Sequence, residues 1–308
     1  MQRKVHRIGP STLMVSLPSS WVKRHKISKG DAVQVEEQKN TLVIAPVTTR
    51  QPQHKKASIL LSSATTSLAR YYLAAAYRSG ADEIHIECKQ QTIADPERNI
   101  VYQTDPFLKL ALENFLGMEI MKYTPAEVVA REITSIKQEE LENIMRRIFF
   151  TLTITFEDLI QHAKMADHEA LNYLYQHADN KVNAFVDYCL RIMAKTSNSD
   201  QSLHASILHL EEIGDALKYI AKQIALKKTD KRTHELLVEA KELFLLAEKY
   251  YYKPAQESLE VFDKRKRDLR KNINRLHNVQ DPIVLMKINK IMQQSGALVR
   301  AKLMQTFL

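Results

Sequence analysis

The stretch IGPSTLMVSLPSSWVKRHKISKGDAVQVEEQKNTLVI, residues 8–44, decides how the first part of the chain folds. Apolar and polar residues alternate in four short runs, RKVHRI, LMVSL, AVQVEE and TLVIAP, which is typical of half-buried β-strands. Between the second and third runs, PSSWVKRHK favours a short helix with Pro18 in its first turn, and KGD at 29–31 favours a turn. Residues 1–47 are therefore predicted to fold in the order β-β-α-β-β.

This predicted unit is small and strongly basic. Fewer than fifty residues bury too little apolar surface to be stable alone, so we expect the unit to dimerise. Residues 1–56 hold eleven Lys and Arg against three Asp and Glu, which is nearly all of the chain's net charge of +9. Such an asymmetry predicts a polyanion partner, with a solvated basic surface as the alternative.

Residues 8–44 resemble the AbrB/SpoVT-type swapped-hairpin domain. The matching features are a glycine-containing loop, an apolar strand ending in Leu-Pro, a basic helix, a Gly-Asp pair and a final pair of strands. The resemblance implies an intertwined homodimer that binds DNA through basic side chains on the first strand and the helix. Arg7, also on the first strand, is added because it is basic and alternates with Arg3. The residues expected to contact DNA are Arg3, Lys4, Arg7, Lys23 and Arg24.

Composition places the chain among globular proteins, with 44% hydrophobic and 26% charged residues over 308 positions. The charged start MQRKVHR is not followed by the apolar core of a secretory signal peptide, so no secretory signal is expected. The run IFFTLTI at 148–154 is far too short to span a bilayer. The two cysteines, Cys88 and Cys189, do not form a CxxC pair. A disulfide framework is therefore not expected, and we predict a soluble cytoplasmic protein without membrane insertion.

The middle of the chain predicts a linker and then a small α/β domain. TTRQPQHKK at 48–56 is polar and basic, as linkers often are. Over 57–134, apolar runs such as SILLS and EIHIEC alternate with the amphipathic stretches SLARYYLAAAYRSG and FLKLALENFLG. The segment has no phosphate-binding glycine motif and no Ser/His/Asp cluster, so an enzyme is disfavoured. The sequence leaves open whether it is a spacer or a ligand-sensing module.

Residues 137–308 predict an all-helical domain. Apolar residues recur at intervals of three and four, and short loops between helices favour antiparallel bundles. The six expected helices form two sets of three, 138–226 and 231–306, as an internal duplication would produce. Their predicted bounds are 138–164, 167–195, 200–226, 231–252, 254–277 and 281–306.

LEEIGDALKYIA, residues 210–221, places Glu211 and Asp215 one turn apart around Gly214 in the middle of a predicted helix. Interior glycine costs roughly 1 kcal/mol relative to alanine, so Gly214 suggests a close approach of backbone or solvent. Glu211 and Asp215 lie on one flank of the apolar stripe of their helix, and three oxygen-bearing side chains lie on the corresponding flank of the preceding helix. An antiparallel hairpin with its loop centred near residue 198 makes these two flanks face each other. These side chains belong to Asp179, Asn183 and Asp187.

Convergence of carboxylates and an amide without an intervening lysine predicts a metal site with oxygen ligands. The alternative is a solvated flank on which Lys218 and Lys222 pair with the acids. A cluster of four carboxylates needs a cation, a shared proton or a lysine, and residue types alone leave these alternatives open.

LEEIGDALKYIA also resembles the LERIGD-type signature of PhoU, the phosphate-uptake regulator family, and the resemblance extends over 138–306 as two repeats. It implies iron or zinc at the first repeat, because Glu211 and Asp215 match one pair of the family's ligand positions. Asp179 and Asn183 match the other pair, and Asp187 is added from the hairpin geometry alone. Joined to an AbrB-like unit, it resembles archaeal phosphate uptake regulators. We therefore expect a DNA-binding transcriptional regulator of phosphate homeostasis. The alternative is an adaptor that does not bind DNA and docks on the ATPase subunit of a phosphate transporter.

Overall fold

The computed structural model describes residues 2–10, 12–38, 41–46, 54–134, 136–227, 230–275 and 281–306. The chain divides into two compact units, Met1–His54 and Lys55–Leu308, each described here by itself. Most of the linker predicted at 48–56 lies outside the described residues, and Lys56 already begins the first strand of the second unit. Within the described ranges, no helix is long and apolar enough to cross a membrane.

The first unit contains two separate antiparallel strand pairs joined through a short helix. Strand β1 pairs with β2, and β3 pairs with β4. Gly9 takes φ +75° in the β1–β2 turn, and the helix ends where Lys26 adopts a left-handed conformation. The observed β-β-α-β-β order is the predicted one. The elements are β1 (Val5–Ile8), β2 (Thr12–Val15), α1 (Ser19–His25), β3 (Val33–Gln38) and β4 (Thr41–Pro46).

The first unit has no buried side chain among those that the structure describes. Its strands carry apolar residues that stay open to solvent, including Leu13 at 69% and Leu42 at 66% exposure. Two-stranded ribbons are marginally stable in water without a covered apolar face. The unit therefore presents strands whose apolar faces need a partner surface.

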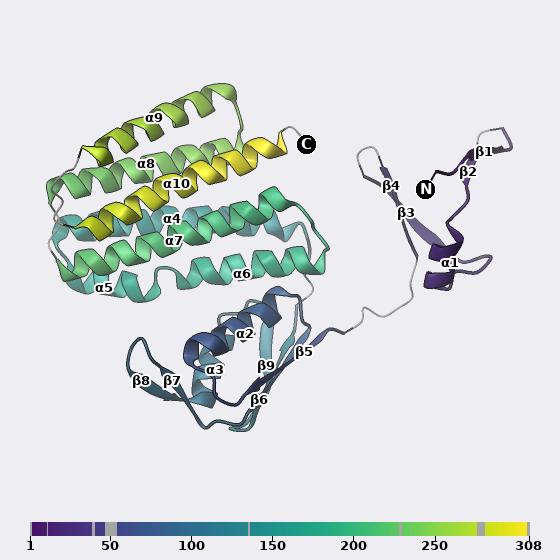
Figure 1. Ribbon diagram of the computed structural model, residues 1–308, viewed down its shortest axis with the longest axis horizontal. Helices are drawn as coiled ribbons and strands as arrows, with labels where there is room; N and C mark the ends of the chain where they lie inside the picture. The colour runs from purple at the N-terminus through teal and green to yellow at the C-terminus, as the bar shows by residue number, and fades with distance from the viewer. Residues whose placement is uncertain are drawn as a thin grey trace. The chain divides into compact units, whose positions relative to one another are not determined.

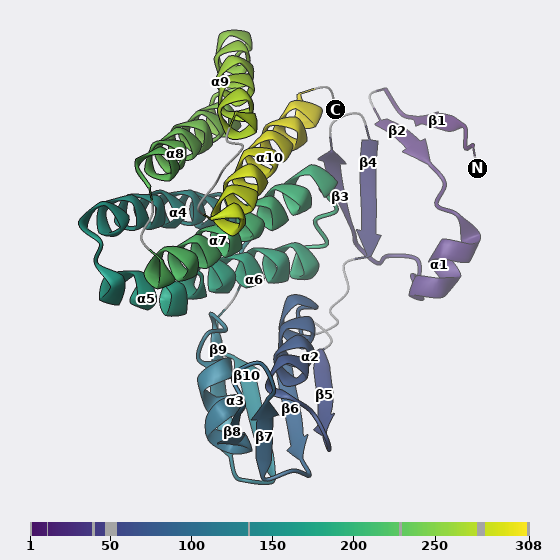
Figure 2. The same cartoon turned by 60° about the vertical axis from the view of Figure 1, so that its left-hand side comes forward.

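The second unit begins with an α/β layer built on a four-stranded sheet. The strand order is β5-β6-β10-β9, with β5 parallel to β6 and the remaining neighbours antiparallel. Helices α2 and α3 cover one face of this sheet (Figure 2). The elements are β5 (Lys56–Leu61), α2 (Thr66–Arg78), β6 (Glu83–Cys88), β7 (Thr92–Asp95), β8 (Ile100–Gln103), α3 (Thr104–Leu112), β9 (Met118–Tyr123) and β10 (Glu127–Glu132).

Strand register explains the two faces of the sheet. Ile84 pairs with Ala130 and Ile86 with Val128, and all four are fully buried beneath the helices. On the opposite face, register places Glu83 between Lys56 and Arg131, which both form ion pairs with it. The hairpin β7–β8 has no counterpart among the elements predicted from the sequence.

The rest of the second unit is helical (Figure 1). The helices lie where apolar periodicity predicts them, except that the expected helix 167–195 is two helices separated at 178–179. Asp and Asn at 179 and 180 favour this break because their side chains compete with helical backbone hydrogen bonds. The elements are α4 (Glu140–Met165), α5 (His168–His177), α6 (Asn180–Lys195), α7 (Gln201–Leu226), α8 (Lys231–Tyr252), α9 (Gln256–Asn274) and α10 (Pro282–Gln305).

Gly214 of α7 lies in the apolar interior of the helical part. A Cβ at this position would stand 3.3 Å from Val182 Cγ1 of α6 and 3.5 Å from Leu152 Cδ2 of α4. The glycine therefore permits three helices to pack closely, and Gly214 itself is buried. A close approach to this backbone is observed, but the expectation that backbone or solvent approaches is wrong, because apolar side chains occupy the space.

Candidate functional site

The five basic residues predicted to contact DNA lie at two places in the first unit. Arg3 and Lys4 directly precede β1, Arg7 lies within β1, and Lys23 and Arg24 occupy the last turn of α1. All five side chains are exposed. Exposed ammonium and guanidinium groups can reach nucleic-acid phosphates, which supply most of the affinity in non-specific DNA binding.

Local structure holds these cations in place. Arg7 donates from Nη2 to the carbonyl oxygen of Pro10 at 2.5 Å, across the β1–β2 turn. At the end of α1, Lys23 and Arg24 lie beside the carbonyl end of the helix, where the helix dipole favours positive charge. Helix α1 therefore places two adjacent cations at its carboxyl end.

Residues 7–52 match the family model described as "Antidote-toxin recognition MazE, bacterial antitoxin". No curated protein and no solved structure matches the chain. The match covers the stretch that resembles the AbrB-type domain, and it supports an AbrB/MazE-like domain at the N-terminus. Such a domain indicates a DNA-binding regulator or an antitoxin-like function.

The predicted metal ligands separate into two clusters, and each contains a basic side chain. In the first, Arg78 at the end of α2 lies between two carboxylates of the helical part. Its Nε donates to Asp187 Oδ1 at 2.5 Å, and its Nη2 donates to Glu211 Oε1 at 3.3 Å. Burial raises the pKa of both carboxyls, and the guanidinium opposes that shift.

The second cluster lies where α6 begins. Lys218 Nζ donates to Asp179 Oδ2 at 2.7 Å, and Asn183 Nδ2 donates to the same oxygen at 3.3 Å. Burial and the nearby Asp179 carboxylate raise the pKa of Asp215. Two buried oxygens, Asp179 Oδ1 and Asn183 Oδ1, accept no hydrogen bond from any described residue.

These contacts change the expected geometry of the metal site. The expectation that the side chains converge without an intervening lysine is wrong, because Lys218 forms an ion pair with Asp179. In addition, Arg78 lies between Asp187 and Glu211. Among the described residues, no group of three or more His, Cys, Asp and Glu side chains is arranged to hold a metal ion. Asp179 Oδ1 and Asn183 Oδ1 have no hydrogen-bond partner among the described residues, whereas Asp187 and Glu211 are bound to Arg78. Metal binding stays a prediction.

Sequence reasoning missed the contacts that join the α/β layer to the helices. Arg191 of α6 is completely buried, and its guanidinium donates to the carbonyl oxygens of Tyr77 and Ala81 at 2.9 and 2.8 Å. The same group bonds Glu132 at 3.0 Å, and Lys195 bonds Glu132 and Asp82. Burying these charges requires the partners to remain in place. The α/β layer is therefore a fixed part of the second unit.

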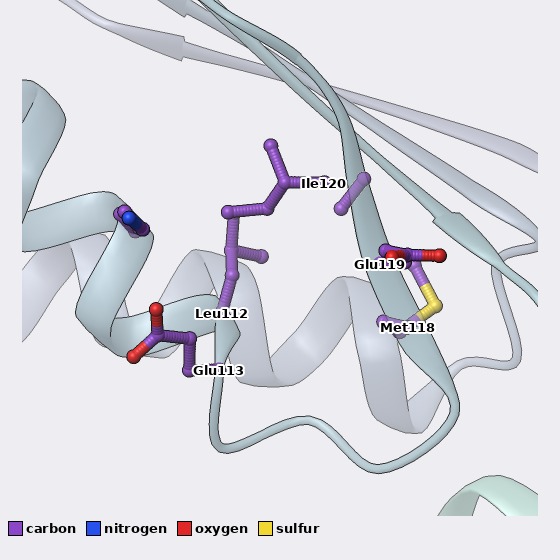
Figure 3. Close-up of a pocket in the computed structure, with 7 residues that line it drawn as sticks. Leu112, Glu113, Met118, Glu119 and Ile120 are labelled. Atoms are coloured by element: carbon purple, nitrogen blue, oxygen red, sulfur yellow. The ribbon is translucent and has the colours of Figure 1, made fainter.

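A shallow pocket of about 310 Å³ lies between the end of α3 and β9 (Figure 3). Leu112 and Ile120 point toward each other across it, and Glu113 and Glu119 lie to the sides. Lys109, Met118 and Ala130 complete the lining. This set contains no nucleophile paired with a base, so the pocket does not suggest covalent chemistry.

Proposed function

We propose that this chain is a homodimeric DNA-binding transcriptional regulator whose helical part senses or binds a partner in phosphate homeostasis. The observation that carries the proposal is the first unit. It matches the antitoxin-type family model, concentrates the positive charge of the chain and leaves the apolar faces of its strands exposed.

Each part of that observation supports a different part of the proposal. Exposed basic groups provide sequence-independent attraction to phosphates, and arginines can add base recognition in a groove. The uncovered apolar strands support dimerisation, because a second copy can bury them. Two copies would present two sets of basic residues to one duplex.

The role in phosphate uptake rests on the PhoU-like stretch LEEIGDALKYIA at 210–221. This stretch lies on α7, which packs in the centre of the helical part and carries Glu211 beside Arg78. A change at Glu211 would act on its ion pair with Arg78, which joins the helices to the α/β layer. The proposal therefore places the sensing element in the second unit and the DNA contacts in the first.

The direct test is footprinting of the full-length protein on the promoter of a neighbouring phosphate-transporter operon. The proposal predicts a protected site that is lost when Arg3, Lys4, Lys23 and Arg24 are replaced by alanine. If no promoter is protected and the protein instead binds a phosphate transporter's ATPase subunit, the adaptor function is correct. Capture of a toxin-like partner by the first unit without DNA protection would favour an antitoxin function.

Iron or zinc binding at the first set of helices remains a separate prediction. Asp179, Asn183 and Asp215 would hold the ion, which would stabilise the folded state by mass action. Melting of the protein with iron, zinc or chelator tests this, and Asp215→Asn should remove any rise in melting temperature. An equal melting temperature under all three conditions contradicts it.

A further inference from the structure

Gly296 of α10 lies at the contact between α9 and α10, where its neighbours are charged side chains. A Cβ at Gly296 would overlap the Lys266 ammonium of α9, stand 3.0 Å from Lys266 Cε and lie 3.5 Å from Arg300 Nη1. The ammonium therefore lies against the backbone of α10, with a guanidinium beside it. At Gly214 the corresponding neighbours are apolar side chains.

Three cations gather at this contact. Lys266 and Arg270 are one turn apart on α9, and Arg300 is one turn beyond Gly296 on α10. Burial lowers the pKa of Lys266, and the positive charges of Arg300 and Arg270 lower it further. Like charges held this close repel each other unless an anion lies between them.

Neighbouring acids are engaged elsewhere. Asp263 lies near Lys266 but forms an ion pair with Arg267 at 3.1 Å. Arg265, the other basic neighbour of Lys266, pairs with Glu242 of α8. Within the described ranges, no carboxylate forms an ion pair with Lys266, Arg270 or Arg300, although other basic residues of α9 have such partners.

We propose that Lys266, Arg270 and Arg300 form a binding site for a small oxyanion that carries two or more negative charges. The two guanidinium groups are exposed and can donate paired hydrogen bonds to oxygen atoms. The ammonium is partly covered and lies against α10, so a group that reaches it must be compact. Phosphate, sulfate and pyrophosphate have this chemistry.

The absence of a side chain at Gly296 is part of the site. A methyl group there would take the place of the ammonium and force Lys266 outward without changing any charge. Gly296→Ala therefore separates the position of the ammonium from its charge. Lys266→Met removes the charge and keeps most of the aliphatic chain.

The test is isothermal titration calorimetry of the full-length protein with inorganic phosphate, sulfate and pyrophosphate, in chloride buffer at constant ionic strength. We expect saturable binding of at least one of these anions with one site per chain. Lys266→Met and Gly296→Ala should each weaken it by about tenfold or more, since a charge-assisted hydrogen bond contributes that much. Lys264→Met, an exposed position on the same helix, is the matched control and should bind like the unchanged protein.

Several results would overturn the site. Absence of saturable binding by all three anions would do so, as would equal affinities in the unchanged protein and Lys266→Met. Loss of duplex DNA affinity in Lys266→Met without any small-anion binding would assign the three cations to a nucleic-acid surface instead. The site lies wholly in the second unit, so its failure leaves the DNA contacts proposed for the first unit untouched.

Discussion

Arg78 shows how one side chain can take the place that residue types assign to a metal. Carboxylates that face each other from two neighbouring helices predict a shared cation. The structure supplies the guanidinium of Arg78, from the α/β layer, to Asp187 of α6 and Glu211 of α7. The need for positive charge at these acids was therefore predictable. Its source was not, because Arg78 is more than one hundred residues away from both carboxylates in sequence.

Replacing Arg78 by methionine should leave Asp187 and Glu211 facing each other without a cation. We expect a loss of about 1–2 kcal/mol of unfolding free energy, reduced from the value for a buried pair because Arg78 is partly exposed. Burial raises both carboxyl pKa values in the folded protein, so stability of the variant should fall as pH rises through that raised range.

Urea denaturation at several pH values between 4 and 7 measures this change. Adding Asp187→Asn to Arg78→Met should restore much of the lost stability and flatten the pH dependence. Arg147→Met, at an exposed position on α4, is the control. Equal stability of Arg78→Met and the unchanged protein at pH 7 would contradict the stabilisation expected from this ion pair.

Glu83 provides a second test at this scale. Its side chain is 2% exposed, and hydrogen bonds from His85, Arg131 and Lys56 lower its pKa to about 2. The stabilisation is present above the ordinary pKa of 4.5 and is lost as pH falls toward 2. Glu83→Gln should therefore reduce the acid dependence of unfolding in this interval, whereas Glu87→Gln on the same strand should not. Parallel acid titrations of the three proteins measure it.

Packing of α7 against α4 and α6 depends on Gly214. Gly214→Val would place branched carbon against Val182 and Leu152 in a buried contact. Overpacking of this kind costs about 1–3 kcal/mol, and β-branching adds a small helix penalty. Thermal or urea unfolding should show the loss. Gln223→Val on the same helix is the control, and equal effects of the two substitutions would mean that the helices do not meet closely at Gly214.

Elements with strong periodicity were predictable from sequence, and those set by distant contacts were not. The apolar repeats of α4, α7 and α8 give their bounds to within a few residues, because the apolar period of a helix is read within the segment itself. Hairpin β7–β8 was missed because its strands, TIAD and IVYQ, are only four residues long, which is the shortest run over which alternation predicts a strand. The buried guanidinium of Arg191 also gives no local signal, since its partners Tyr77 and Ala81 lie in another layer.

The two units differ in how far they bury their own apolar side chains. The second unit covers its core, which includes Phe149, Phe156 and Phe244. The first unit leaves Leu13 and Leu42 on its strands exposed. A single copy of the first unit is therefore incomplete in a way that the second is not, and the proposed dimer resolves this difference.

Assembly can be measured on the full chain by analytical ultracentrifugation. The unchanged protein should sediment as a dimer at micromolar concentration, because pairing of two first units buries their apolar strands. Leu13→Lys with Leu42→Lys should shift it toward monomer, since charges would enter the interface. Leu110→Lys, at an exposed position on α3, is the control. A monomeric unchanged protein would contradict the proposed assembly.

The central claim, that the first unit binds DNA through its basic residues, is tested most directly by the salt dependence of DNA affinity. Full-length protein should bind a duplex with an affinity that falls steeply with salt. Replacing Arg3, Lys4, Lys23 and Arg24 by alanine should reduce the slope of log K against log salt by about 3–4 for each protomer that contacts the duplex. The control replaces four exposed cations of the second unit, Lys89, Arg98, Lys109 and Arg147, and should keep the slope. Unchanged affinity and slope in the first variant would contradict the claim.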